Sequence, residues 1–174
     1  MTNGSIKQVH FVSDPMLDRC HQLVSKYEFS NSQWEYFKQS IQSGVNIRGD
    51  IMYTYNVDGE IMGFVKGQRT YPPDNAIGLP LQDLGAEIEW LYVGVPHRNG
   101  VGQRLFDTFV NHIKKYEAKS LFVYSATTEQ AVCFYGKNNL TPRGPDCLLG
   151  RTFEYANKRN FILTQIDRIR KKVM

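Results

Sequence analysis

Apolar side chains recur every three or four positions in four stretches of the chain, the spacing of an amphipathic helix. The first helix is expected to begin at Asp14-Pro15, because aspartate caps a helix and proline suits its first turn. The second begins at Ser30 or Ser32 and ends at Gly44. The third spans 100–117 and the fourth about 128–137. The residues that set the spacing are Leu17, Cys20, Leu23, Val24 and Tyr27, then Trp34, Phe37 and Ile41, then Val101, Leu105, Phe109 and Ile113.

Other stretches are rich in β-branched and aromatic residues and predict strands at 6–12, 86–95 and 120–126, with further strand material between 140 and 156. The run IMYTYNVDGEIMGFVKGQRTY predicts two strands joined at Asp58-Gly59, a strong hairpin signal. Residues 72–85 contain three prolines and two glycines and predict a loop long enough to serve function.

The expected element order is β α α β β β α β α β, which predicts an α/β fold. The sheet should be mixed, with about six or seven strands flanked by helices, because the hairpin is antiparallel while strand–helix–strand units favour parallel neighbours. A chain of 174 residues with 41% hydrophobic residues suits one domain, assigned to 1–156. Residues 157–174 form a basic tail.

The tail combines an apolar seam with most of the excess charge. The net charge of the chain is +4, and the segment from Arg151 onward holds seven basic residues against Glu154 and Asp167. A helical tail of this kind would dock on the domain or on a twin subunit, so a homodimer stays open. The alternative is a basic arm that meets nucleic acid or an acidic partner, although no RNA-binding motif accompanies it. The seam residues are Ile162, Ile166, Ile169 and Val173.

The composition indicates in which cellular compartment the protein is expected and whether a metal site is expected. No stretch of 18 apolar residues and no signal-peptide pattern is present, so no membrane partner is expected. Cys20, Cys133 and Cys147 are odd in number and scattered, which fits free thiols in a reducing, cytoplasmic setting. No CxxC or HxxxH pair occurs, so no metal site is expected.

The segment LYVGVPHRNGVGQRLF at 91–106 passes from a strand through glycines into a helix. A helix N-terminus offers unpaired N–H groups, and glycine lets them approach a ligand closely. Arg98 adds a donor suited to phosphate. The turn around Gly100 and Gly102 therefore predicts a pyrophosphate cradle, or, alternatively, only a tight strand-to-helix connection.

Together with SLFVYSATTEQAVCFYGKNNLTPRG further on, this turn resembles the GNAT superfamily of acyl-CoA-dependent N-acyltransferases over roughly residues 86–142. The sequence departs from the family pattern at three points. The Arg98 turn is one residue shorter, Thr128 stands where asparagine is frequent, and Asn139-Leu140 replaces a closing Gly-Phe. Asn139 can adopt the left-handed conformation that ends a helix.

The resemblance implies acetyl-CoA as co-substrate and a role for several residues. Backbone groups near Val93 and Val95 would pair with the pantetheine arm, and the amides of 98–103 would hold the pyrophosphate. Tyr135 would act as general acid for the departing thiolate. The implied cofactor-binding residues are Val93, Gly94, Val95, Arg98, Asn99, Gly100, Val101, Gly102, Gln103 and Thr128.

Glu87 and Glu89 are the candidate general bases, because an attacking amine must lose a proton. They share a strand face unless a bulge intervenes, and Glu87 matches the base position of some members of the family. Both could instead be an ordinary exposed pair. The expected function is an N-acetyltransferase acting on a primary amine of a small molecule or peptide. A non-catalytic CoA-binding or nucleic-acid-associated protein is the alternative.

Overall fold

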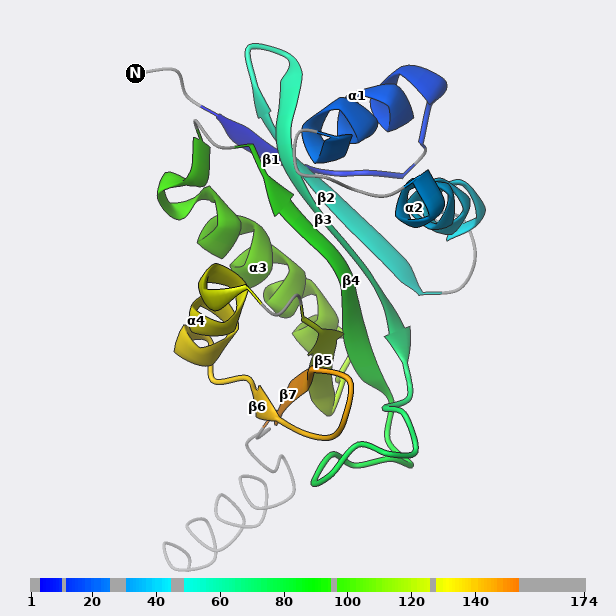
Figure 1. The fold of residues 1–174 in the computed structure, drawn as a ribbon, viewed down its shortest axis with the longest axis vertical. Coiled ribbons are helices and arrows are strands. Elements are labelled where there is room, and N and C mark those ends of the chain that lie inside the picture. The colour runs from blue at the N-terminus through cyan, green and yellow to red at the C-terminus, as the bar shows by residue number, and fades with distance from the viewer. Residues whose placement is uncertain are drawn as a thin grey trace, which may run out of the picture.

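The structure is a computed structural model that describes residues 4–10, 12–25, 31–44, 49–94, 97–125 and 128–153. The element order is β1 (Ser5–Gln8), α1 (Asp14–Ser25), α2 (Asn31–Gly44), β2 (Asp50–Val57), β3 (Glu60–Thr70), β4 (Gly85–Val93), α3 (Arg98–Lys115), β5 (Ser120–Tyr124), α4 (Glu129–Lys137), β6 (Thr141–Pro142) and β7 (Leu148–Thr152). This is the predicted order, with the last segment resolved into two strands (Figure 1).

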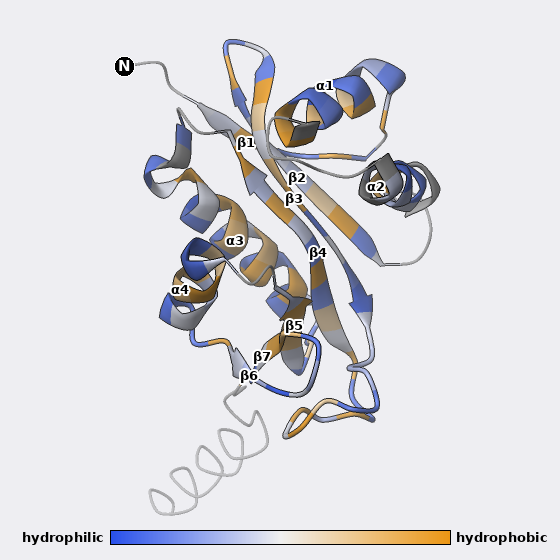
Figure 2. Cartoon of the chain, viewed as in Figure 1, coloured by the Kyte–Doolittle hydropathy of each residue, from blue (hydrophilic) through white to orange (hydrophobic). Residues whose placement is uncertain are grey.

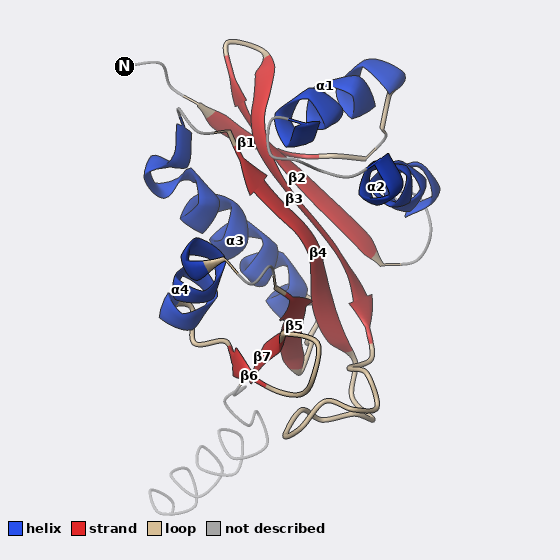
Figure 3. Ribbon diagram, in the orientation of Figure 1, coloured by secondary structure: helices blue, strands red, loops and turns tan. Residues whose placement is uncertain are grey.

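The seven strands form one mixed sheet in the order β1-β2-β3-β4-β5-β7-β6. All neighbours are antiparallel except β4 and β5, which are parallel. Helices α1 and α2 lie on one face, and α3 and α4 lie on the other (Figure 3). The α/β fold class with a mixed sheet is therefore confirmed.

Each face of the sheet has its own apolar core. Phe64 and Met52 pack with α1 and α2, whereas Val65 and Ile51 pack with α3. Neighbouring residues face opposite ways because side chains alternate along a strand. The strands and the helix sides turned toward them carry most of the apolar residues (Figure 2). The alternation divides each central strand between two layers of helix.

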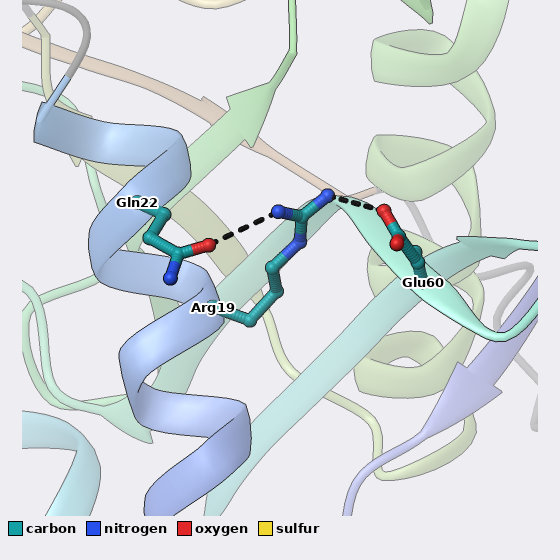
Figure 4. Close-up of polar contacts among 3 residues, drawn as sticks. All are labelled: Arg19, Gln22 and Glu60. Carbon is teal, nitrogen blue, oxygen red and sulfur yellow. Dashed lines mark hydrogen bonds and ion pairs between the residues drawn. The ribbon is translucent and has the colours of Figure 1, made fainter.

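The β2–β3 hairpin turns where the sequence predicts. Asp58 and Gly59 have φ of 51° and 85°, the two left-handed residues that a tight hairpin of this kind needs. Helix α1 is tied to the hairpin by Arg19, which contacts Gln22 on its own helix and Glu60 at the start of β3, with Nη2 2.6 Å from Glu60 Oε2 (Figure 4).

Several predicted boundaries shift by a few residues. The first strand ends at Gln8 instead of 12, and β5 is described to Tyr124 instead of 126. Asn139 has φ of 61°, as expected of a left-handed residue beyond a helix end. The predicted tail at 157–174 and the predicted helix start at Ser30 lie outside the described residues.

Candidate active site

The two strands that carry the candidate chemistry separate soon after they meet. β4 and β5 pair at Ala86↔Leu121 and Glu87↔Phe122 only, within residues that the structure describes. β4 continues to Val93, bound to β3 along its other edge. The sheet is therefore parted from Ile88 onward, between its two parallel strands.

The backbone of β4 shows which groups face this parting. The Gly94 amide donates to Met62 O at 2.8 Å, which turns it toward β3, and the Gly94 carbonyl accepts from His97 N at 2.9 Å. Since backbone groups alternate in direction along an antiparallel pair, those of Leu91 and Val93 point toward the β5 side. Gly94, a candidate from the sequence, thus uses its backbone groups within the protein. Val95 lies outside the described residues.

The start of α3 is not a regular helix. Asn99 has ψ of 85° and Gly100 has φ of 81°, so regular helical geometry begins only at Val101. Gly100 needs to be glycine here, because a φ of this sign disfavours other residues. No side chain caps the helix at His97, and the first amides of a helix lack partners within it. Arg98 contributes its backbone to the turn.

Space remains around the two glycines. A Cβ at Gly100 would meet no atom within 4 Å, and one at Gly102 would meet Phe134 and Val93 at 3.8 Å, an ordinary contact. The backbone conformation accounts for glycine at position 100, whereas neither conformation nor close packing within the described residues requires it at position 102. Small residues here leave room for a ligand to approach the amides at the helix start.

Two candidate cofactor residues use their side chains inside the protein. Gln103 exchanges hydrogen bonds with Asn138, 2.8 Å from Nε2 to Oδ1 and 3.1 Å in return, and also donates to Asp107. This pair links α3 to α4. Thr128 caps α4 by accepting from the Ala131 amide at 3.3 Å. Only the backbone of Gln103 and the exposed surface of Thr128 are therefore available to a cofactor.

Glu87 and Glu89 lie on the sheet face that α1 and α2 cover. The register of β4 shifts between the pairs Lys66↔Trp90 and Gly67↔Ile88, so Glu89 is the extra residue of a β-bulge. Ile88 packs on the α3 side and Trp90 on the α2 side, and both glutamates stay on the α2 side. The bulge therefore lets Glu89 and Trp90 share one face.

The two glutamates have different surroundings. Glu89 forms a short ion pair with the ammonium of Lys66, which also lies 3.3 Å from Asp50 Oδ1. Lys66 is only 2% exposed, and its partners are 11% and 13% exposed, so this is a buried charge cluster. Sequence reasoning missed Lys66 because its two partners belong to neighbouring strands.

Glu87 has no such ion pair in the described part of the chain, and its side chain bonds that of Gln68 across the strands. Burial raises the pKa of Glu87, and the charge of Glu89 raises it further, while Gln68 and Lys66 lower it. A carboxylate with a raised pKa is a stronger base than an exposed one. The surroundings of Glu87 therefore favour its uptake of a proton.

Tyr135 lies on the other side of the sheet. It is 7% exposed, packs in the core beneath α3 and α4, and contacts the ring of Phe134. Burial raises the pKa of its hydroxyl, which keeps the group protonated at neutral pH. Glu87 and Tyr135 thus lie on opposite faces of the sheet.

Two exposed tyrosines, Tyr36 and Tyr124, border the face that carries Glu87. Tyr36 on α2 lies 6.2 Å from the ring of Trp90, and Tyr124 on β5 is within electrostatic reach of Glu87. The loop between β3 and β4 packs Ala76 and Leu79 against Phe122, beside Glu87. The two tyrosines therefore offer exposed aromatic surface near the charge of Glu87.

No protein-family model matches the chain, and no curated protein does so either. The fold is nevertheless that of the GNAT acetyltransferases. N-acetyltransferase PaiA of Thermoplasma acidophilum, solved with coenzyme A, aligns over 86% of this chain and 99% of its own, with 15% identity and a TM-score of 0.58. NAA60 of Arabidopsis thaliana, solved with a bisubstrate analogue, aligns over 86% and 100%, with 15% identity and a TM-score of 0.63.

A ribosomal-protein-alanine N-acetyltransferase of Brucella melitensis aligns over 78% of this chain and 90% of its own, with 19% identity and a TM-score of 0.55. At such identities the likeness concerns the fold. It confirms the GNAT resemblance at that level, across nearly the whole length of each of these proteins. No helix among the described residues is long and apolar enough to span a membrane.

Proposed function

We propose that the protein transfers an acetyl group from acetyl-CoA to a primary amine, with Glu87 as general base and Tyr135 as general acid. The observation that carries this proposal is a glutamate with a raised pKa at the point where β4 and β5 part. An uncapped, glycine-spaced helix start follows on the same strand. The general base, the parting of the sheet and the amides that would bind an anion thus follow one another along β4 and into α3.

The residues fit acetyl-CoA in three respects. The amides at 101–103 and the space beside Gly100 and Gly102 suit a pyrophosphate. The β4 edge that faces away from β3 suits the amides of a pantetheine arm, which would add to it like a strand. The parting beyond Glu87 gives the thioester access to both faces of the sheet.

The chain's residues would move two protons. The amine nitrogen attacks the thioester carbonyl carbon, a C–N bond forms and the C–S bond breaks. Glu87 takes the proton that the amine must lose, directly or through a water, and the Tyr135 hydroxyl gives its proton to the departing thiolate. The charge of Glu89, which is paired with Lys66, contributes to the raised pKa of Glu87.

The acceptor is a primary amine on a small molecule or a peptide. Glu87 together with Glu89 and Asp50 of the cluster outnumbers Lys66 on this face, so the site favours a cationic amine. One of the similar structures is named a ribosomal-protein-alanine N-acetyltransferase, which supports a peptide amine among the candidates.

Release of free thiol from acetyl-CoA tests this function. The amines to offer are a peptide with a free α-amino group, a peptide with a lysine, a polyamine and an amino sugar. We expect release with at least one class and an acetylated product of matching mass. A protein that binds acetyl-CoA but releases no thiol above background with any class would instead be a non-catalytic CoA-binding protein.

A further inference from the structure

A second candidate site lies beside α3, α4 and β7, and neither glutamate lines it. It is a cavity of about 390 Å³ between the C-terminal end of α3, the end of α4 and strand β7. Lys114 is twelve residues beyond Gly102, so about 18 Å of helix separates the cavity from the glycine turn. The residues that line it are Lys114, Asn139, Arg143, Arg151, Thr152 and Phe153.

The lining is cationic. It holds three basic side chains and no acidic one. Within the described chain, none of the three has a carboxylate at ion-pair distance. Asp107, whose charge acts on Arg151, is on α3 and accepts a hydrogen bond from Gln103. Like charges gathered in a hollow without counter-ions repel one another unless an anion joins them.

Arg151 is fixed in place by its neighbours. Its guanidinium lies 5.5 Å from the ring of Phe106 and 5.2 Å from that of Phe153. Its Nη1 donates to the Asn138 carbonyl at 2.8 Å. Its Nε is excluded from solvent and has no hydrogen-bond partner. A donor that is both buried and unsatisfied is unfavourable, and a bound acceptor would relieve it.

Lys114 completes the arrangement. Its ammonium lies 5.0 Å from the same Phe153 ring that Arg151 contacts, so the two charges flank one ring. Lys114, Asn139 and Thr152 are exposed, which leaves the cavity accessible from solvent. Arg143 also lines the cavity, and its Nε donates to the Gly150 carbonyl at 3.2 Å.

We propose that this cavity binds a phosphate group of a small molecule, at a site separate from the acetyl-transfer site. Arginine donates in a planar fork that matches phosphate oxygens, and lysine adds a point charge. Asn139 and Thr152 supply neutral donors beside them. The volume falls in the range of small-ligand pockets. Free phosphates and the phosphate esters of nucleotides share this chemistry.

Pyrophosphate is the first probe, titrated by calorimetry at constant ionic strength into protein saturated with acetyl-CoA, so that the glycine turn cannot take it up. We expect saturable binding that Lys114→Gln weakens about tenfold, the loss of one charge-assisted hydrogen bond. Lys115→Gln is the matched control, because it removes the same charge from the next, exposed residue of α3. It should bind like the unmodified protein.

Arg151→Gln is a second variant, used only if its melting temperature shows that it folds. ADP in place of pyrophosphate tells whether a nucleotide ester or a free phosphate is preferred. The absence of pyrophosphate binding would overturn the proposal, and so would equal affinities for the Lys114 and Lys115 variants. Two results together would mean that pyrophosphate binds at the glycine turn instead. Acetyl-CoA would compete with pyrophosphate, and Gly102→Glu would be the only variant that loses pyrophosphate binding.

Discussion

At the scale of single residues, the two glutamates of β4 lie on the same face of the sheet but have different interaction partners. Glu89 is bound to the buried Lys66, whereas Glu87 faces Gln68 and carries a raised pKa. Since burial is the largest cause of that rise, the ionised form of Glu87 is held at a cost in stability. A loss of stability at a residue with a perturbed pKa is typical of catalytic sites.

We expect Glu87→Gln to lower turnover by about 10²–10⁴-fold, the usual contribution of a general base. Its melting temperature at neutral pH should be unchanged or higher. A carboxyl with a raised folded pKa stabilises the protein while protonated, and this contribution is lost as pH rises through that pKa. Glutamine stays neutral throughout. Turnover and thermal unfolding measured together check both expectations, with the exposed Glu35→Gln as control.

The raised pKa also sets the direction of the pH profile. Turnover should fall as pH drops, with its acid limb above the ordinary glutamate value, because Glu87 must be ionised to accept a proton. An acid limb at the ordinary value, or a Glu87→Gln variant as active as the control, would exclude Glu87 as the base.

Tyr135→Phe should lower turnover and leave acetyl-CoA affinity nearly unchanged, because only the hydroxyl that protonates the thiolate is lost. Removal of a buried hydroxyl leaves the packing of the ring in place. Tyr116→Phe, at an exposed tyrosine after α3, is the control. The measurement is steady-state kinetics with an identified acceptor. If Tyr135→Phe turned over as fast as Tyr116→Phe, Tyr135 would have no part in the mechanism.

At the scale of elements, the Lys66 cluster joins three neighbouring strands. Asp50 belongs to β2, Lys66 to β3 and Glu89 to β4. Ion pairs buried to this degree add little net stability, yet removal of one partner leaves an uncompensated charge. The cluster therefore fixes the bulge of β4 beside Glu87.

Lys66→Met should destabilise the fold by about 3 kcal/mol, which is a fall of roughly 10 °C in melting temperature. The double variant Lys66→Met/Glu89→Gln should recover part of the loss, because Glu89 no longer needs a counter-ion. Chemical denaturation of the single and double variants measures the coupling. Additive effects would show that the ion pair is not a coupled unit.

Most elements of this fold follow from local patterns, whereas the site depends on contacts that the patterns do not contain. The hairpin at Asp58-Gly59 and the helix start at Asp14 need only neighbouring residues. Lys66 appears in the sequence as one charge in an alternating strand, and its burial depends on partners 16 and 23 positions away. The bulge at Glu89 arises from strand register, which no local signal fixes.

At the scale of the whole molecule, the parted sheet explains how a base and an acid on opposite faces could serve one reaction. Glu87 lies on the α1–α2 side of the sheet, and Tyr135 packs in the core on the α3–α4 side. Among the residues that the structure describes, strands β4 and β5 pair at two positions and then separate. A long, thin co-substrate could lie in the parting with its anionic end on the start of α3.

Calorimetric titration of acetyl-CoA into the protein and into Gly102→Glu tests this account most directly. The added carboxylate would occupy the space beside Gly102 and repel the pyrophosphate. Asn111→Glu adds the same charge to an exposed position of the same helix, about 14 Å further along, and is the control. We predict micromolar binding, about −8 kcal/mol, retained by Asn111→Glu and weakened at least tenfold by Gly102→Glu. No binding to the unmodified protein, or equal binding by all three, would contradict it.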